Sequence, residues 1–321
     1  MTCKICGQAG LQRTHRVREM MFGYREWFTY YECFNCGCLQ IAEIPADLSK
    51  YYPANYYSLT HLPDAQNYNP VQKLMKRLRD RYAVCGKGAL GKWLYRKFPN
   101  ESLFSLSGVE YLSKDTRILD VGCGTGMLLW DLRNLGFTNT MGVEPFLERD
   151  LEYANGLHIL KRTFFEIGGT WDLIMFHHVL EHLENPGDTL QHAARLLASN
   201  GMCLIRTPVV PCYAWEHYGT NWVQLDAPRH LFIYSAKGIE ILAQQASLKL
   251  IKKRFDSNDF QFWGSEQYRK DIPLMADVSY LVDTAPHLFS KRQIAGFKAQ
   301  AEKLNAANCG DSTVYYLAKC E

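Results

Sequence analysis

The fold is decided by the nine residues from 118 to 126, which read Ile118-Leu119-Asp120-Val121-Gly122-Cys123-Gly124-Thr125-Gly126. The apolar residues at the start predict a buried β-strand, and the three glycines that follow predict a tight turn into a helix. Because glycine has no Cβ atom, such a turn lets the backbone approach a ligand that side chains would exclude. The stretch therefore predicts a ligand site at the carboxyl end of a strand in an α/β domain.

The spacing of the glycines separates two kinds of ligand. A dinucleotide-binding turn has the pattern G-x-G-x-x-G, whereas Gly122, Gly124 and Gly126 form G-x-G-x-G. Asp120 precedes the turn, and its carboxylate would repel a pyrophosphate and attract a cation. Glu144 lies at the end of the next predicted strand, where an acid accepts hydrogen bonds from ribose hydroxyls. These residues favour a positively charged nucleoside, and a NAD-binding domain is the alternative.

After Thr116, short apolar runs alternate with segments of helical period, which is typical of a doubly wound parallel sheet with crossover helices. The best-marked helix begins after Asn185, has Pro186 at its first position, and is followed by Gly201. A second helix begins after Ser235. We therefore predict an α/β, Rossmann-like domain with seven strands, at residues 117–121, 140–144, 157–161, 171–176, 202–207, 248–256 and 313–319.

From Ser113 onward the successive motifs resemble those of class I S-adenosylmethionine-dependent methyltransferases. They are residues 119–126, Gly142-Val143-Glu144, Trp171-Asp172-Leu173-Ile174 and His178-Val179-Leu180-Glu181-His182-Leu183. The resemblance implies that the glycines make room for the methionine and ribose parts, that Glu144 holds the ribose, and that Asp120 lies near the amino-acid portion. The cofactor-binding residues that it implies are Asp120, Gly122, Cys123, Gly124, Gly126, Glu144, Pro145, Phe165, His177 and His178.

The segment from His178 to His182 also matches the H-x-x-E-H pattern of one metalloprotease class. Two histidines four residues apart on a helix could bind zinc. However, the segment directly follows a predicted strand in a chain that already carries a methyl-donor turn. We therefore interpret Glu181 and His182 as helix-start and packing residues, and expect His177 or His178 to border the cofactor. The protease is the alternative.

A long segment follows the fifth predicted strand, from Thr207 to Ser235, and loops of this length are usually functional. Its ending, Pro228-Arg229-His230-Leu231-Phe232-Ile233-Tyr234-Ser235, resembles methyltransferases of bacterial polysaccharide and deoxysugar pathways. In the sugar C-methyltransferases of that group a histidine at this place is the base. The resemblance implies His230 as general base, with Tyr213, Glu216 or His217 as helpers. The alternative is that Arg229 and His230 only pin the loop by hydrogen bonds.

Five of the eleven cysteines lie within the first 38 residues, where Cys3-Lys4-Ile5-Cys6-Gly7 and Cys33-Phe34-Asn35-Cys36-Gly37 form two C-x-x-C-G turns. Four thiolates at this spacing close a tetrahedral, structural zinc site, and so short a segment needs a metal to hold a core. We predict a zinc ribbon in residues 1–45, with the ligands Cys3, Cys6, Cys33 and Cys36. Cys38 in place of Cys36, and iron in place of zinc, are the alternatives.

Residues 46–112 read as a helical linker or cap. Between positions 71 and 98 there are nine Lys or Arg residues against one acid, Asp80. Apolar residues at helical spacing form the other face of this helix, namely Val71, Leu74, Met75, Leu78 and Tyr82. The basic face could meet an anionic membrane surface, a sugar diphosphate or RNA, and a merely solvated face is the alternative. The tyrosines 51, 52, 56 and 57 either fold over the site or pack as a linker.

Composition places the chain among folded globular proteins. Of 321 residues, 47% are hydrophobic and 21% charged, and the net charge is +3. No apolar run reaches the length of a membrane span, and the start shows no secretory signal, so we expect a cytoplasmic protein in a reducing compartment. The methyltransferase domain is expected at 113–321, with an insertion at 258–309 that caps the substrate side.

Together these features predict a methyltransferase that uses S-adenosylmethionine and acts on a small polar acceptor, with a sugar nucleotide or activated saccharide precursor as the expected substrate. This sequence shows no counterpart of the large extra C-terminal domain of the sugar C-methyltransferases, which does not favour a carbon acceptor. One alternative is a tRNA or rRNA methyltransferase that grips RNA with the ribbon and the basic helix. The other is a non-catalytic S-adenosylmethionine-binding protein.

Overall fold

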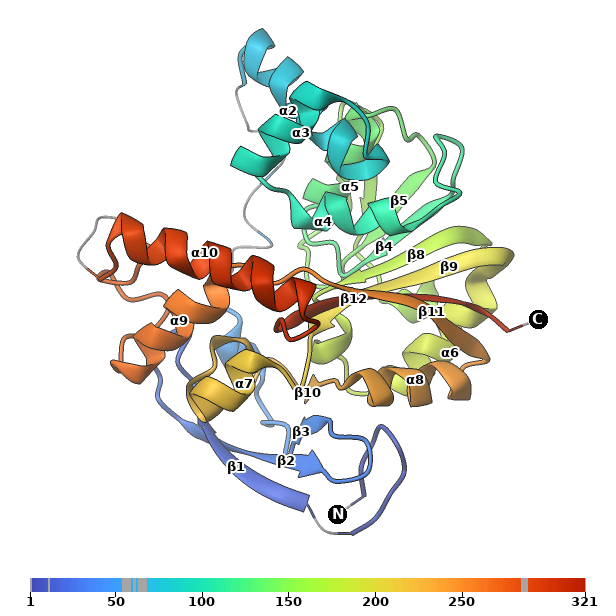
Figure 1. Cartoon of the computed structure of the whole chain (residues 1–321). Coiled ribbons are helices and arrows are strands. Elements are labelled where there is room, and N and C mark those ends of the chain that lie inside the picture. Colours follow the sequence, from blue (N-terminus) through green and yellow to red (C-terminus); the bar gives the residue numbers. More distant parts are fainter. Residues whose placement is uncertain are drawn as a thin grey trace.

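A central β-sheet organises the computed structural model, which describes residues 2–10, 12–53, 59, 62, 68–283 and 288–320. Its strands are β4 (Ile118–Val121), β5 (Thr140–Val143), β6 (Leu151–Glu152), β7 (His158–Leu160), β8 (Trp171–His177), β9 (Leu197–Pro208), β11 (Leu248–Phe255) and β12 (Ser312–Lys319). They are ordered β11-β12-β9-β8-β4-β5-β7-β6 (Figure 1). All seven predicted strands are present. The eighth is β6, a two-residue strand at the sheet edge that is too short to show a pattern in the sequence.

The centre of the sheet is doubly wound, as predicted. Strand β4 pairs in parallel with β5 on one side and with β8 on the other, and β9 continues in parallel from β8. Strand β12 then pairs antiparallel with β9, and β11 pairs antiparallel with β12. The chain reverses its winding direction between β4 and β8, and α/β domains of this kind bind their ligands at the carboxyl ends of the strands at such a point. Because Val121 pairs with Phe176, the glycine turn after β4 and the end of β8 lie side by side.

Helices cover both faces of the sheet (Figure 1). Side chains alternate along β8, so that Ile174 and Phe176 join one core while Leu173 and Met175 join the other. The first core contains α6 (Pro186–Leu196) and α8 (Ala236–Gln245). The second contains α2 (Pro70–Cys85), α4 (Glu101–Ser105) and α5 (Met127–Asn134).

The boundaries of α6 and α8 test the helix signals in the sequence. Helix α8 begins after Ser235, as predicted, and the Ser235 side chain caps it by accepting from the backbone N–H of Gly238. Asn185 precedes α6, but its side chain makes no capping hydrogen bond. The prediction that Gly201 follows the end of α6 is wrong, because the helix ends at Leu196 and β9 begins at the next residue. Gly201 lies inside β9, where a register shift against β8 accommodates the extra residues.

The N-terminal ribbon consists of β1 (Gln12–Arg18), β2 (Trp27–Cys33) and β3 (Leu39–Ile41). A fourth strand, β10 (Phe232–Ile233), pairs with β3 and comes from the long segment after β9. The hydroxyl of Tyr30 donates to the backbone carbonyl of His230 at 2.6 Å. The ribbon is thus joined by backbone and side-chain bonds to the loop that carries the predicted base.

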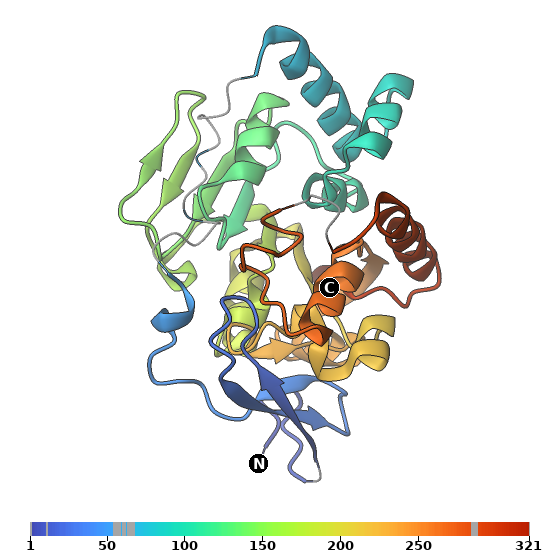
Figure 2. The ribbon, with the colours of Figure 1, turned by 90° about the vertical axis from the view of Figure 1, so that its left-hand side faces the viewer.

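The basic stretch folds into α2 and α3 (Ala89–Lys97), which turn at Gly86, a glycine with φ of +68°. Its acid, Asp80, is buried and pairs with Lys76 and Arg79. The predicted apolar face is largely unpacked, since Val71, Leu74 and Met75 are exposed. Figures 1 and 2 place the pair of helices α2 and α3 and the ribbon at opposite ends of the molecule. This separation does not favour the binding of one RNA by both.

The predicted insertion is partly helical, with α9 (Phe260–Arg269) and α10 (Lys291–Ala306) between β11 and β12. Its capping of the substrate side stays a prediction. Of the four tyrosines from 51 to 57, the last two lie outside the described residues. In the part of the chain that the structure describes, no helix combines the length and apolar composition that crossing a bilayer requires.

Candidate active site

The glycine turn after β4 has the backbone that its sequence predicts. Gly122, Gly124 and Gly126 have φ values of +65°, +55° and +83°, in the left-handed region that glycine adopts readily. A Cβ atom at Gly122 would lie 2.6 Å from the Val179 side chain, and one at Gly126 would lie 2.6 Å from Ile159. The turn is therefore packed tightly between the segment after β8 and strand β7.

Two buried acids flank this turn. The carboxylate of Glu144 accepts hydrogen bonds from the backbone N–H of Gly124, at 3.1 Å, and of Phe146, at 3.2 Å. Asp120 is buried, and its Oδ1 has no hydrogen-bond partner within the described residues. Burial and the negative charge of Glu144 raise the pKa of Asp120 to about 8. A buried carboxyl oxygen without a partner among the described residues, beside a turn of three glycines, fits a cationic ligand.

The remaining predicted cofactor residues lie around the same turn. Cys123 packs against Gly142 of β5, where a Cβ atom would collide with its sulfur. Pro145 directly follows Glu144. Phe165 lies after β7 in the 3₁₀ turn Phe164–Glu166 and is 53% exposed, so its ring is open to a ligand. Its predicted contact with adenine stays a prediction.

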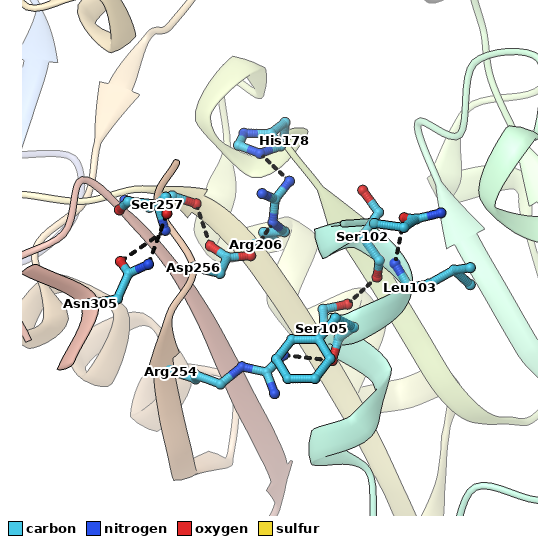
Figure 3. A network of polar contacts seen from close by, with 12 residues as sticks. Ser102, Leu103, Ser105, His178, Arg206, Arg254, Asp256, Ser257 and Asn305 are labelled. Carbon is cyan, nitrogen blue, oxygen red and sulfur yellow. Dashed lines mark hydrogen bonds and ion pairs between the residues drawn. The ribbon is translucent and has the colours of Figure 1, made fainter. Parts of the chain in front are cut away.

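His177 and His178 end β8 beside the glycine turn. Both ring nitrogens of His177 are buried without a partner among the described residues, and burial together with the charge of Arg206 lowers its pKa to about 3. His178 has φ of +53°, which is strained for a non-glycine residue. Its Nε2 accepts from the Arg206 guanidinium at 2.7 Å, and its Nδ1 donates to Glu181 Oε1 at 3.2 Å. Figure 3 shows Arg206 between His178 and Asp256, with which it forms an ion pair.

The structure gathers Glu181, His182 and His230 into one cluster. One ligand atom from each lies within 4.8 Å of the others. The rings of His182 and His230 meet edge to face with centroids 4.7 Å apart. Burial, together with the charge of His230, lowers the pKa of His182 to about 4. Burial alone would raise the pKa of Glu181, but the hydrogen bond with His178 and the charges of the nearby histidines lower it to about 2.

The interpretation of Glu181 and His182 as helix-start and packing residues is therefore incomplete. They lie in the 3₁₀ turn Leu180–His182 rather than at the start of α6, and they face a histidine from another loop. Reading the sequence could not find this cluster, because nothing local to residues 178–182 indicates that residue 230 lies beside them. The H-x-x-E-H pattern was the available signal, but His178 is outside the cluster.

The Arg229 side chain anchors the long segment after β9, as the alternative interpretation of Arg229 proposed. Its guanidinium is fully buried and donates to Glu19 of the ribbon at 3.0 Å and to Asp226 at 2.6 Å. The backbone carbonyl of Arg229 accepts from His182 Nδ1 at 2.9 Å. One buried cation thereby connects the ribbon, the long loop and the turn after β8.

The predicted helpers lie apart from His230. Tyr213, Glu216 and His217 are on α7 (Tyr213–Tyr218), and no contact joins them to His230 in the described chain. The rings of Tyr213 and His217 stack on each other at 5.3 Å, and Glu216 and His217 are exposed. Their catalytic roles, and that of His230 as base, stay predictions.

The four predicted metal-ligating cysteines form a cluster, as expected. The sulfurs of Cys3 and Cys36 are 3.7 Å apart, those of Cys6 and Cys33 are 3.6 Å apart, and all four lie within 4.8 Å of one another. Cys38 is not part of the cluster, because its sulfur accepts from the backbone N–H of Ser235 at 3.2 Å. The cluster therefore contains Cys36 rather than Cys38, and its role as a metal site stays a prediction.

The doubly wound sheet and the acid-flanked glycine turn define a class I, S-adenosylmethionine-dependent methyltransferase domain. The family model described as a methyltransferase domain matches residues 85–253, which is more than half of the 321 residues. The chain belongs to this family. The comparison confirms the predicted fold and the class of enzyme.

Among curated proteins, the chain is similar to ubiquinone biosynthesis O-methyltransferases. It is 31% identical to the one from Caulobacter sp. strain K31 over 101 residues, which are 28% of this chain and 40% of that protein. It is 31% identical to the one from Rickettsia conorii over 137 residues, which are 39% of this chain and 45% of that protein. The matches thus span less than half the length of these relatives.

Among solved structures, the chain is similar to a methyltransferase in complex with the Trm112 methyltransferase activator from Haloferax volcanii. The TM-score is 0.48 at 16% sequence identity, covering 76% of this chain and 98% of that chain.

Proposed function

We propose that this protein transfers the methyl group of S-adenosylmethionine to a hydroxyl oxygen of a small polar acceptor. The observation that carries the proposal is the carboxyl group of Asp120, whose Oδ1 is buried beside the glycine turn with no partner among the described residues, near Glu144. The name O-methyltransferase of the relatives supports oxygen as the acceptor atom. That name refers to ubiquinone biosynthesis rather than to a sugar pathway, so the sugar-nucleotide acceptor stays a prediction without support from them.

The residues of the turn and the two acids beside it would contact different parts of the bound cofactor. Bound S-adenosylmethionine supplies a methyl group that its sulfonium already makes electrophilic. Glu144 would hold the ribose hydroxyls, the glycines would leave room for the backbone to approach, and Asp120 would face the positive charge. Gly122 packs against Val179, so the glycine turn and the turn after β8 are neighbours. The acceptor would then lie by Glu181, His182 and His230, which belong to or contact the turn after β8.

An acceptor screen tests this function. The purified protein is incubated with methyl-labelled S-adenosylmethionine and, separately, with hydroxylated aromatic compounds, sugar nucleotides and bulk tRNA. We expect label in a hydroxyl-bearing small molecule and none in RNA. Labelling of RNA alone would favour the nucleic-acid methyltransferase. Tight binding of the cofactor with no labelled product in any class would favour the non-catalytic protein.

Asp120 predicts a pH dependence of cofactor affinity. Its pKa is about 8 in the free protein, and a bound sulfonium should lower it, because an opposite charge favours the ionised form. Below pH 8 binding must therefore release a proton, so affinity should rise by up to about tenfold per pH unit between pH 6 and 8 and level off above. S-Adenosylhomocysteine, whose sulfur is neutral, should show a smaller rise.

Calorimetric dissociation constants for both ligands at pH 6, 7, 8 and 9 provide the measurement. The Asp120→Asn variant, which cannot ionise at this position, should lose the difference in slope between the ligands. Equal slopes for the two ligands in the unmodified protein would contradict the assigned role of Asp120.

We further propose that the cysteine cluster binds a structural zinc ion. The four sulfurs are close enough to share one ion, and closed sulfur coordination leaves no position for a substrate. Replacing Cys33 with serine should remove about one equivalent of zinc and lower the melting temperature, because β1 to β3 and β10 then lose their cross-link. Cys85 is exposed, so Cys85→Ser is the matched control. Unchanged zinc content in Cys33→Ser, measured by atomic emission, would contradict the proposal.

A further inference from the structure

In the cluster of Glu181, His182 and His230, one ring nitrogen of each histidine has a lone pair that no hydrogen bond uses. His182 Nδ1 lies 2.9 Å from the backbone carbonyl of Arg229, and His230 Nδ1 lies 2.8 Å from that of Gln224. A carbonyl oxygen only accepts hydrogen bonds, so both Nδ1 atoms carry the hydrogen. In a neutral ring with this tautomer, Nε2 is a bare acceptor, and neither Nε2 atom has a hydrogen bond within the described residues. The closest acid to His230 Nε2 besides the cluster is Asp226, at 4.0 Å.

Glu181 presents an unpartnered oxygen to the same place. The residue is fully buried, and its Oε1 accepts from His178 while its Oε2 has no partner among the described residues. Burying a carboxylate oxygen without a partner is expensive, so such an atom indicates a missing ligand. The orientation of the carboxylate is well supported, since His178 is held by Arg206 and Arg206 by Asp256 (Figure 3).

We propose that Glu181, His182 and His230 bind a divalent transition-metal ion. Two imidazole nitrogens and one carboxylate oxygen are a ligand set typical of Zn²⁺ and related ions. The three ligand atoms lie within 4.8 Å of one another, so small side-chain shifts would bring them to the bond lengths of about 2.0–2.2 Å that one shared ion requires. The backbone carbonyls that hold both Nδ1 atoms and the chain from His178 to Asp256 form the outer shell that such ligands require. His178 is not a ligand, because both of its nitrogens are engaged.

Three protein ligands leave a coordination position open, which is typical of a catalytic site. The chemistry at that position rests on the proposed function, whereas the binding of the ion does not. An acceptor hydroxyl bound there would lose its proton to solvent more readily. Its oxygen lone pair would form the new O–C bond as the C–S bond of the methyl donor breaks, and that electron pair would stay on sulfur. His230 would then be a ligand, which replaces the role of general base expected from the sequence.

Cobalt substitution tests the site without an activity assay. Metal-free protein is titrated with Co²⁺ alone and followed by visible and near-ultraviolet absorption. Thiolate-to-cobalt charge transfer reports the cysteine cluster, and weaker bands without charge transfer report a nitrogen–oxygen site. We expect two equivalents of Co²⁺ in the unmodified protein. We expect one equivalent of Co²⁺ in Cys33→Ser, with no thiolate-to-cobalt charge-transfer band.

The ligand variants are Glu181→Gln and His230→Asn, and His217→Asn is the control because His217 is exposed on α7. Both ligand variants should lose Co²⁺ affinity at the second site on the order of a hundredfold or more while keeping charge transfer, and His217→Asn should keep both sites. Calorimetry with S-adenosylmethionine on the same samples reports folding and tests the proposed function separately. The inference would be overturned if both ligand variants bound two equivalents of Co²⁺ with unchanged affinity. It would also be overturned if Cys33→Ser samples that still bind S-adenosylmethionine bound no Co²⁺.

Discussion

Replacing Glu144 with glutamine is expected to weaken binding of S-adenosylmethionine roughly 10- to 100-fold, the usual range for one hydrogen bond to a charged group. Glu144 has two tasks in the structure. It accepts from the backbone N–H groups of Gly124 and Phe146, and it is the acid that we expect to hold the ribose. A glutamine keeps the shape but turns an N–H group toward one of these donors. The glycine turn and the ribose contact are therefore both weakened.

The measurement is the calorimetric dissociation constant for S-adenosylmethionine, with circular dichroism to verify the fold. Glu152 is the matched control, because its side chain is 79% exposed on β6 and, among the described residues, its only ion pair is with exposed His158. Glu152→Gln should bind the cofactor as the unmodified protein does. If Glu144→Gln also retains full affinity, the cofactor does not contact this acid and the assignment of the turn fails.

Replacing Arg229 with methionine should lower the free energy of unfolding by about 3–5 kcal/mol, the usual penalty when one partner of a buried ion pair is removed. The guanidinium is fully buried, and so is the side chain of its partner Glu19, while Asp226 is 16% exposed. Methionine would leave both carboxylates in the interior without a counter-charge. The ribbon and the long loop would lose the group that joins them.

Denaturant unfolding of Arg229→Met, alone and combined with Glu19→Gln, distinguishes the charge from the packing. Removing the unpaired acid should restore part of the lost stability in the double variant. Arg292→Met, on the exposed surface of α10, should have little effect. A loss of stability in Arg229→Met no larger than in Arg292→Met would show that the buried ion pair does not hold the ribbon to the loop.

The strands of the central sheet could be predicted because each is a short apolar run with a local signal. Ile118, Leu119, Ile174 and Leu204 are all fully buried, and such runs are visible without knowing what covers them. The glycine turn was equally local. The pairing of β10 with β3 was not, because two residues, Phe232 and Ile233, complete a sheet whose other strands are nearly two hundred positions earlier.

The site beyond the cofactor could be predicted only in part. His230 was singled out from its motif, and Glu181 and His182 from theirs, but the contact between the two segments depends on how Arg229 anchors the loop. The helpers Tyr213, Glu216 and His217 share the long segment with His230, but they lie on α7 and make no contact with it among the described residues. Proximity in sequence was a poor guide where a long connection folds back on itself.

The central claim is that the acid-preceded glycine turn binds a cationic sulfur nucleoside. Titration calorimetry of the unmodified, metal-loaded protein with S-adenosylmethionine, S-adenosylhomocysteine and NAD tests it most directly. We expect saturable binding of the first two at one shared site and no heat with NAD. Binding of NAD, with no heat from either sulfur nucleoside, would contradict it.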